Sequence, residues 1–439
     1  TRALINTKIC DKGTTIVTSL PPATPPSNSA PVVAPTPVAP IQTLSVVPAP
    51  IQRHPTPIVL PAPIVVPAPV VTPVVQVPAL PPISVPAPLP VVLPQTPSFA
   101  SATVTSAHRF QQGVAYGGWG PHLGKLLRST TNELYLADDT GNDVKRNAGL
   151  AYYKQVNGQW VQIGSNAFLG TVQQNTGSVM KGTVIFTYGI DTENHRVEEC
   201  YFDTVQNTKG CKHLPFVLPA NSNYIGAALT PSGHRVVWWT NGGNGAPGTF
   251  EYIYNFGNGW NGVVSSNIAG FSAVGYINIA FYDDSRFVLH AKLMAGVGPQ
   301  WTFIASYADG SLGSQITTWG NLASVGASDL ISATNDVWID PQGGTHILGQ
   351  SVAGTTSYHY RSPGSNGAFS KVLASFPGVY RARFIKSTDG NLYVAYGKQG
   401  DGLRVITIPL SSINGALSLQ ESASQKIATS AGYEFIDSI

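Results

Sequence analysis

Residues 138–143 place several oxygen ligands in one short stretch of the sequence. The run ADDTGNDVKR contains Asp138, Asp139, Asn142 and Asp143, and Ca²⁺ prefers carboxylate and amide oxygens. The spacing differs from that of an EF-hand, and polar turns of this kind are common between strands. We keep these four residues as a candidate calcium site against the commoner alternative of an ordinary turn. We expect no other metal and no cofactor.

Arginines could converge to bind a carboxylate, as in a sialidase-like active site that also needs a tyrosine and an acid. The candidates, which come from separate parts of the sequence, are Arg128, Arg235, Arg286, Arg381, Arg383 and Arg404. Exposed arginines on strands are common, so we expect these six to stay apart rather than to form one cluster. Two-carboxylate glycosidases would instead need a facing acidic pair.

Histidine and tyrosine could act as base and acid in a polysaccharide lyase. Five histidines fall in or beside expected strands: His122, His234, His290, His346 and His359. None has the spacing of a metal site, and the commoner alternative is a hydrogen-bonded or surface histidine. The sequence contains no P-loop, nucleophile elbow or dinucleotide fingerprint.

Aromatic residues near turns could stack on sugars. They are Tyr116, Trp119, Trp160, Trp260 and Trp301. Aromatic residues also fill the core between tightly packed strands, and we favour packing over sugar binding for these five.

The chain contains three cysteines. Cys200 and Cys211 flank two short strand pieces around a turn, which predicts a disulfide between them in an oxidising compartment. Cys10 then remains, either for a bridge to another chain or as a free buried thiol.

A repeat of about fifty residues sets the frame for these candidates. One series of turns precedes strongly apolar strands, at Asn132, Gly182, Gly233, Ser285, Gly344 and Gly390. A second series follows about 25 residues later in each unit, at Gly158, Gly210, Gly259, Gly310, Gly367 and Gly415. Asn-Gly and Asp-Gly turns favour tight hairpins, so each unit reads as four antiparallel strands.

Four strands per repeat predict an all-β fold, a six-bladed β-propeller. Runs such as RVVWWT should be buried on both faces, as strands between neighbouring blades are. The C-terminal AGYEFIDSI could complete the first blade, and residues 100–125 leave a seventh, degenerate blade as an alternative. We expect the two turn series at opposite ends of the blades.

The repeat resembles those of sialidase-like and BNR-like propellers, in which a turn of the form S-x-D-G-x-L leads into the second strand of each blade. Ser387, Asp389, Gly390 and Leu392 match this pattern. The resemblance covers roughly residues 108–439 and implies a propeller. The stricter aspartate box of sialidases, S-x-D-x-G-x-T-W, is absent.

The sequence before the repeats divides into an N-terminal segment, 1–20, with some strand potential, and a proline-rich stem, 21–98; the propeller takes 99–439. The stem is rich in Val, Ile, Leu and Ala and contains one full charge, Arg53. Such a sequence adopts extended polyproline II, and its apolar side chains need a protein surface. We expect burial against another copy of the chain for Ile64, Val65, Val66, Val70, Val71, Val74 and Val75.

Composition narrows the function. Only 11% of residues are charged and the net charge is +3, so the sequence shows no basic patch of the kind that binds nucleic acid. Proline interrupts every apolar run of membrane-spanning length. We expect an extracellular structural protein, more a non-enzyme than an enzyme, whose stem docks on neighbouring propellers in a head-to-tail homopolymer that forms a filament or surface fibre. The alternatives are a glycan hydrolase or lyase with a proline-rich stalk and a carbohydrate-binding adhesin, so glycans are candidate partners.

Overall fold

The computed structural model describes residues 126–428 except for 140–143, 174–175, 244–245, 296–301, 326–335, 351–355, 377–378, 387–390, 399–400 and 411–423. The stem with its seven assembly residues, Cys10, residues 100–125 and the C-terminal AGYEFIDSI lie outside the described residues. The assembly, seventh-blade and blade-closure predictions therefore stay predictions. Within the described part, no helix is long and apolar enough to span a membrane.

The described chain forms six antiparallel sheets in sequence order, each built around four strands. Blade 1 contains β1 (Leu126–Arg128), β2 (Leu134–Asp139), β4 (Gly149–Val156) and β5 (Gln159–Ala167). Blade 2 contains β7 (Gly177–Lys181), β8 (Val184–Asp191), β9 (Arg196–Asp203) and β10 (Lys209–Val217). Blade 3 contains β11 (Ser222–Leu229), β12 (Arg235–Gly243), β13 (Ala246–Asn255) and β14 (Val264–Asn267).

The second half of the ring repeats this pattern. Blade 4 contains β15 (Ala273–Phe281), β16 (Arg286–Ala295), β17 (Thr302–Ser311) and β18 (Gly320–Val325). Blade 5 contains β19 (Asp336–Ile339), β20 (Thr345–Gln350), β21 (Thr356–Arg361) and β22 (Ser370–Phe376). Blade 6 contains β23 (Val379–Lys386), β24 (Asn391–Lys398), β25 (Gly402–Pro409) and β26 (Gln425–Ala428).

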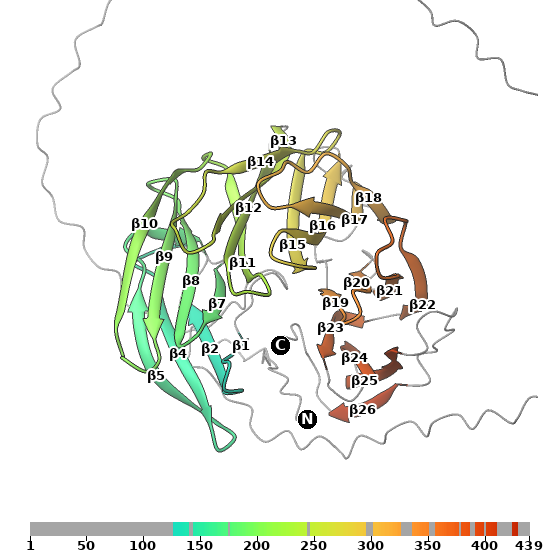
Figure 1. Cartoon of the computed structure of the whole chain (residues 1–439), viewed down its shortest axis with the longest axis horizontal. Helices are drawn as coiled ribbons and strands as arrows, with labels where there is room; N and C mark the ends of the chain where they lie inside the picture. The colour runs from blue at the N-terminus through green and yellow to red at the C-terminus, as the bar shows by residue number, and fades with distance from the viewer. Residues whose placement is uncertain are drawn as a thin grey trace, which may run out of the picture. The chain divides into compact units, whose positions relative to one another are not determined.

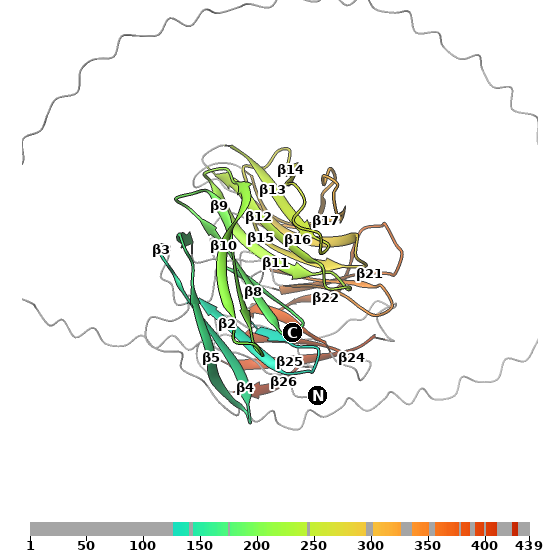
Figure 2. The same ribbon diagram turned by 60° about the vertical axis from the view of Figure 1, so that its left-hand side comes forward.

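The blades are arranged as a β-propeller, which confirms the predicted fold. In Figure 1 the first strands of the blades, such as β11, β15 and β19, lie nearest the centre. Two short strands add to blade 2: β3 (Val144–Arg146) pairs with β6 (Thr171–Gln173), and β6 pairs with β8. Figures 1 and 2 both show the sheets of blades 1 and 2 side by side.

The predicted turns hold at most of the described positions and fail at two, whereas Gly390 and Gly415 lie outside the described residues. Gly182 and Gly233 adopt positive φ of 60° and 77° between the first and second strands of their blades, as the sequence indicated. Gly210 and Gly310, however, lie inside strands β10 and β17. Each faces an aromatic ring of the neighbouring strand so closely that a Cβ would clash, with Tyr201 and Phe287 respectively. These two glycines leave space for aromatic rings and do not form turns.

The expectation that the two turn series occupy opposite ends of the blades is wrong. In a meander of four antiparallel strands, the first and third connections must fall at the same end. We call this end the turn end. The other end, which we call the loop end, contains the connections between second and third strands and the connections from each blade to the next.

The cores lie between adjacent sheets. Val236, Val237, Trp238 and Trp239 of β12 are all buried, which confirms that this strand packs on both faces. Burial of apolar side chains on two faces is what a propeller blade requires, because each sheet packs against two neighbours. This packing between sheets therefore fixes the positions of the strand ends, where the polar groups described below lie.

Candidate functional site

Two tyrosines near the loop end of neighbouring inner strands have an unusual backbone. Tyr224 of β11 and Tyr276 of β15 adopt positive φ of 50° and 55°, each at an irregularity in the pairing with the second strand of its blade. A bulky residue in this region costs on the order of 1–3 kcal/mol. The same strained bulge at corresponding positions of two blades points to a constraint beyond folding.

The two side chains form a row with Lys292 of β16. The ring centroids of Tyr224 and Tyr276 are 5.0 Å apart, and Lys292 Nζ lies 5.3 Å from the Tyr276 centroid. Tyr276 and Lys292 are buried, whereas Tyr224 is half-buried. We call Tyr224, Tyr276 and Lys292 the tyrosine row; Tyr224 is its most exposed member.

Burial changes the proton affinities in the tyrosine row. Desolvation lowers the pKa of Lys292 to about 8, because a charged amine loses its hydration in the interior. Burial also raises the pKa of Tyr224, and the hydrogen bond with Tyr276 opposes this shift. Near neutral pH the row therefore combines the protonated phenol of Tyr224 with an amine that can readily release its proton.

A second polar cluster lies at the loop end of blade 2. Asp191 ends β8, Glu198 follows near the start of β9, and His213 lies directly opposite Glu198 on β10. His213 Nε2 is 2.8 Å from Asp191 Oδ2 and 3.7 Å from Glu198 Oε2. We call these three residues the blade 2 triad. Both carboxylates are fully buried, and the imidazole is half-buried.

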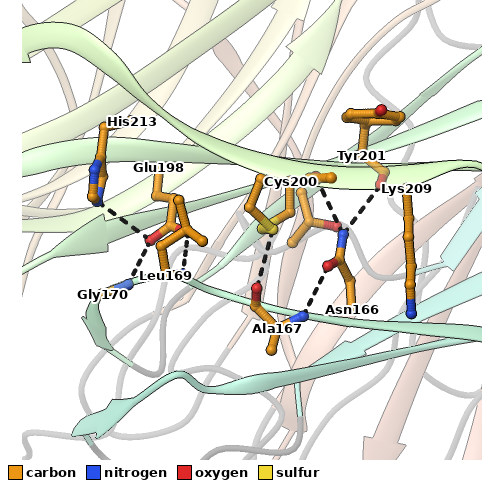
Figure 3. The surroundings of a disulfide bond; sticks show 12 residues. Asn166, Ala167, Leu169, Gly170, Glu198, Cys200, Tyr201, Lys209 and His213 are labelled. Atoms are coloured by element: carbon orange, nitrogen blue, oxygen red, sulfur yellow. Dashed lines mark hydrogen bonds and ion pairs between the residues drawn. A yellow bond between two sulfur atoms is a disulfide. The ribbon is translucent and has the colours of Figure 1, made fainter.

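The blade 2 triad is held from behind by backbone amides. Leu169 N and Gly170 N, in the connection from blade 1, donate to Glu198, as Figure 3 shows. Burial raises the pKa of Glu198, and these hydrogen bonds oppose the shift. Burial alone would raise the pKa of Asp191 as well, but hydrogen bonds from Asn194 and Glu193 hold it below its ordinary value.

Cys200 and Cys211 lie next to this triad and are joined by a disulfide, the pairing that the sequence indicated. They are direct cross-strand partners on β9 and β10, with Cα atoms 4.1 Å apart. Closing a loop of this length contributes about 2–3 kcal/mol by restricting the unfolded chain. In Figure 3 the disulfide lies between the Glu198 contacts and Asn166, which donates to the carbonyls of Tyr201 and Gly210.

A buried relay links Tyr358, His346 and Asp340 in blade 5. The Tyr358 hydroxyl lies 2.6 Å from His346 Nδ1, and His346 Nε2 lies 3.0 Å from Asp340 Oδ2. Burial lowers the pKa of His346, so the neutral ring accepts from the phenol and donates to the carboxylate. Since all three side chains are buried, the relay is a core network rather than a site that a ligand reaches.

The arginines do not converge in the described part of the chain. Arg235 pairs with Glu199 at 2.7 Å, Arg286 with Asp283 at 2.7 Å, and Arg404 with Asp401 at 2.5 Å. Arg383 is 3.7 Å from Asp336, and Arg128 binds the side chain of Asn132. Nothing is described for the Arg381 side chain. A sialidase-like arginine cluster is therefore not formed by the described arginines.

The histidine and aromatic candidates that the structure describes also lie in different surroundings. His290 and His359 are buried in strands and His234 lies beside Asp284, while His122 falls outside the described residues. Trp260 packs edge-on against Tyr188 and lies under Arg235, and Trp160 is half-buried in β5. Tyr116, Trp119 and Trp301 are not described.

The calcium candidate is only partly described. Asp138 is buried in β2, and Asp139 is the last residue of that strand. Asn142 and Asp143 lie outside the described residues, so this site stays a prediction.

Sequence reasoning missed both clusters because each depends on strand register. His213 meets Glu198 only once β10 is aligned with β9, and Lys292 meets Tyr276 only through pairing of β16 with β15. One signal was present: the run RVEECYF places two glutamates within an otherwise apolar strand. Acidic residues in such a strand are rarely buried without partners.

Comparison with known proteins gives similarities of shape only. No protein-family model and no curated protein sequence matches this chain. Among solved structures, a Penicillium chrysogenum alpha-L-arabinanase complexed with arabinobiose has 12% identity and a TM-score of 0.43, covering 67% of this chain and 97% of that chain.

Two further solved structures are similar at the same level. An ulvan lyase of a polysaccharide lyase family has 11% identity and a TM-score of 0.43, covering 66% of this chain and 82% of that chain. The SapL1 lectin in complex with alpha methyl fucoside has 12% identity and a TM-score of 0.38, covering 66% and 94%. The β-propeller architecture itself rests on the six sheets described above.

Proposed function

We propose that this protein binds acidic glycans at the tyrosine row. The observation that carries the proposal is the repeated left-handed backbone at Tyr224 and Tyr276, on neighbouring inner strands at the loop end. Backbone strain of this kind is retained where the surrounding structure holds side chains in a required position. Here it holds two phenol rings together beside an amine.

The residue types suit a sugar that bears a negative charge. Tyrosine offers an apolar ring face and a polar hydroxyl, so it can stack on a pyranose and hydrogen-bond to its hydroxyl groups. Lys292 offers three N–H donors and a positive charge to a carboxylate or sulfate. A carboxylate or sulfate would form a charge-assisted hydrogen bond with this amine, which a neutral sugar does not offer.

The shifted pKa of Lys292 gives this proposal a pH signature. The free protein loses the Lys292 proton near pH 8, whereas a bound anion stabilises the charged amine. Binding therefore takes up a proton above this pH. Affinity for an acidic glycan should be greatest below pH 8 and should fall as pH rises through it.

The test is calorimetric titration of the full chain with uronate-rich, sulfated and neutral oligosaccharides. We expect binding of an acidic class, loss of affinity of about tenfold or more in Lys292→Met and Tyr224→Ala, and no change in Lys181→Met. Lys181 is an exposed lysine at the turn end of blade 2 and serves as the matched control. Equal affinity of wild type and Lys292→Met would refute the role of the row.

A lyase activity is the second candidate, favoured by the lowered pKa of Lys292 beside Tyr276. The neutral amine would take the C5 proton of a uronate, the electron pair would form the C4–C5 double bond, and the C4–O bond would break. The leaving oxygen would take its proton from the Tyr276 phenol. Such cleavage gives an unsaturated product with ultraviolet absorbance that grows with time, whereas binding alone gives none.

Two other hypotheses receive less support. The carboxylates Asp191 and Glu198 are buried. Glu198 accepts from amides of the blade 1 connection and Asp191 from amides of its own turn, so two-carboxylate hydrolysis of a glycan is not proposed for them. The filament hypothesis depends on the stem, which lies outside the described residues. It stays a prediction from the sequence.

A further inference from the structure

The blade 2 triad presents three potential metal ligands at one point, whereas the tyrosine row belongs to blades 3 and 4. Gly189, Glu198 and His213 are successive cross-strand partners on β8, β9 and β10. Side chains at directly opposed positions share one face of a sheet. Asp191, two residues beyond Gly189, projects from the same face.

The donor atoms are already spaced for a single small ion. One donor atom from each of Asp191, Glu198 and His213 lies within 4.8 Å of the other two, and the closer pairs are 2.8 Å and 3.7 Å apart. Oxygen and nitrogen ligands lie about 2.0–2.2 Å from Zn²⁺, so two ligands of one ion are at most about 4.3 Å apart. On binding an ion, His213 Nε2 and Asp191 Oδ2, which now lie at hydrogen-bond distance, would have to move apart.

The charge at this point is unbalanced. Asp191 and Glu198 are both fully buried, and among the described residues no lysine or arginine forms an ion pair with either of them. In this part of the structure, His213 is the one cationic partner described for the two carboxylates, and it supplies at most one positive charge. A divalent cation would neutralise both and let the imidazole bind through a neutral nitrogen.

Gly170 packs closely against Asp191. A Cβ atom at this position would lie 2.1 Å from Asp191 Oδ2, so a residue with a side chain would clash with the carboxylate. Hydrogen bonds orient both carboxylates: Leu169 N donates to Glu198 Oε1 and Gly170 N to Glu198 Oε2. The amides of Glu193 and Asn194 donate to Asp191 Oδ1, and the Asn194 side chain donates to Asp191 Oδ2. Outer contacts of this kind orient ligating carboxylates in metal sites.

We propose that Asp191, Glu198 and His213 bind a divalent transition-metal ion of the Zn²⁺ or Mn²⁺ class. An imidazole with two carboxylates favours such ions over Ca²⁺ and Mg²⁺, which prefer oxygen ligands alone. The half-exposed His213 provides the route from solvent. Because Glu198 also accepts from Leu169 and Gly170, the ion fixes the connection between blades 1 and 2.

The test uses the full chain, stripped with a chelator and then titrated with Zn²⁺, Mn²⁺, Ca²⁺ and Mg²⁺ in a calorimeter. We expect one equivalent of Zn²⁺ or Mn²⁺ to bind with micromolar or tighter affinity and to raise the melting temperature. Affinity should fall at least about 100-fold in His213→Gln and Asp191→Asn. Asp191→Asn keeps a side-chain oxygen for the turn amides, and circular dichroism reports whether each variant is folded.

His234→Gln is the matched control. His234 is exposed to the same extent as His213 and lies 4.0 Å from Asp284, but no second carboxylate is paired with it in the described structure. It should bind metal as wild type does. Three results would each overturn the proposal: no binding by wild type, a preference for Ca²⁺ over Zn²⁺ and Mn²⁺, or unchanged affinity in folded His213→Gln. The imidazole would then be the partner of the two carboxylates without a metal.

Discussion

The turn end and the loop end of the propeller use charged side chains in opposite ways. At the turn end, Asp203 and Asp340 accept hydrogen bonds from the amides of their own turns, and Asp283 does the same. The pKa of each of these carboxyls is lowered. At the loop end, burial moves Lys292 and Glu198 toward their neutral forms.

This difference distinguishes charged groups that stabilise the fold from charged groups that are candidates for a function. A carboxylate that satisfies the amides of its own turn is stabilised as an ion and costs the fold nothing. A buried group whose charged form is disfavoured reduces stability, and such groups concentrate at functional sites. Asp191 combines both roles, because one of its oxygens binds turn amides and the other faces His213.

The largest effect should come from removing the turn-end carboxylate that also reaches the core. Asp340→Ala should lower the free energy of unfolding by about 3–5 kcal/mol, because it leaves the buried His346 without its acceptor and the amides of Gln342 and Gly344 without theirs. Chemical denaturation measures this. Asp340→Asn retains an acceptor and should lose less; an equal loss in both would mean that the charge, rather than the hydrogen bonds, matters.

At the loop end the same kind of change should have the opposite sign. Lys292→Met should raise the free energy of unfolding at pH 7 by about 1–3 kcal/mol, because a desolvated charge is replaced by an apolar chain of similar shape. The same variant should lose glycan binding. A destabilised Lys292→Met would show that Lys292 serves the fold and would remove the contrast between the ends.

The pH dependence sharpens this point. The pKa of Lys292 is about 8 in the folded chain and about 10.4 in the unfolded chain, so the unfolded state binds more protons between these values. The contribution of Lys292 to stability therefore rises with pH across that window, by up to about 3 kcal/mol. Denaturation of wild type and Lys292→Met at several pH values between 8 and 10 should show their difference shrinking; a constant difference contradicts the burial effect.

The smallest effect concerns backbone conformation at the turn end. Gly233→Ala should cost about 1 kcal/mol, because φ is 77° there and alanine disfavours that region. Gly262→Ala is the control, since φ at Gly262 is not positive and no atom lies within 4 Å of the added Cβ. Thermal melts of the two variants should differ, and neither should change glycan binding.

The sequence predicted the fold better than the sites, for a physical reason. Turns such as Gly182 and Gly233 are encoded by adjacent residues, so their repeat is visible in the sequence. Gly210 and Gly310 look identical by that criterion, yet they lie in strands because a ring on the next strand needs the space. Cross-strand contacts of this kind depend on register.

The candidate sites depend on register to a greater extent. Tyr224 and Tyr276 are ordinary strand residues in the sequence, and only the irregular pairing of their strands places them in a left-handed conformation. The disulfide was predictable because Cys200 and Cys211 are close in the sequence and on either side of one turn. His213 and Asp191 are 22 positions apart, across two turns, and no local pattern connects them.

The short strands β3 and β6 have a consequence for how the ring comes apart. Strand β3 lies in the connection between the second and third strands of blade 1, and β6 lies in the connection from blade 1 to blade 2. Both belong to the same hydrogen-bonded sheet as β8 of blade 2. Each of the other sheets in the described chain is built from the strands of a single blade. Blades 1 and 2 should therefore open as one cooperative unit, with amides of 144–146 and 184–191 exchanging hydrogen at a common rate, while later blades can open singly.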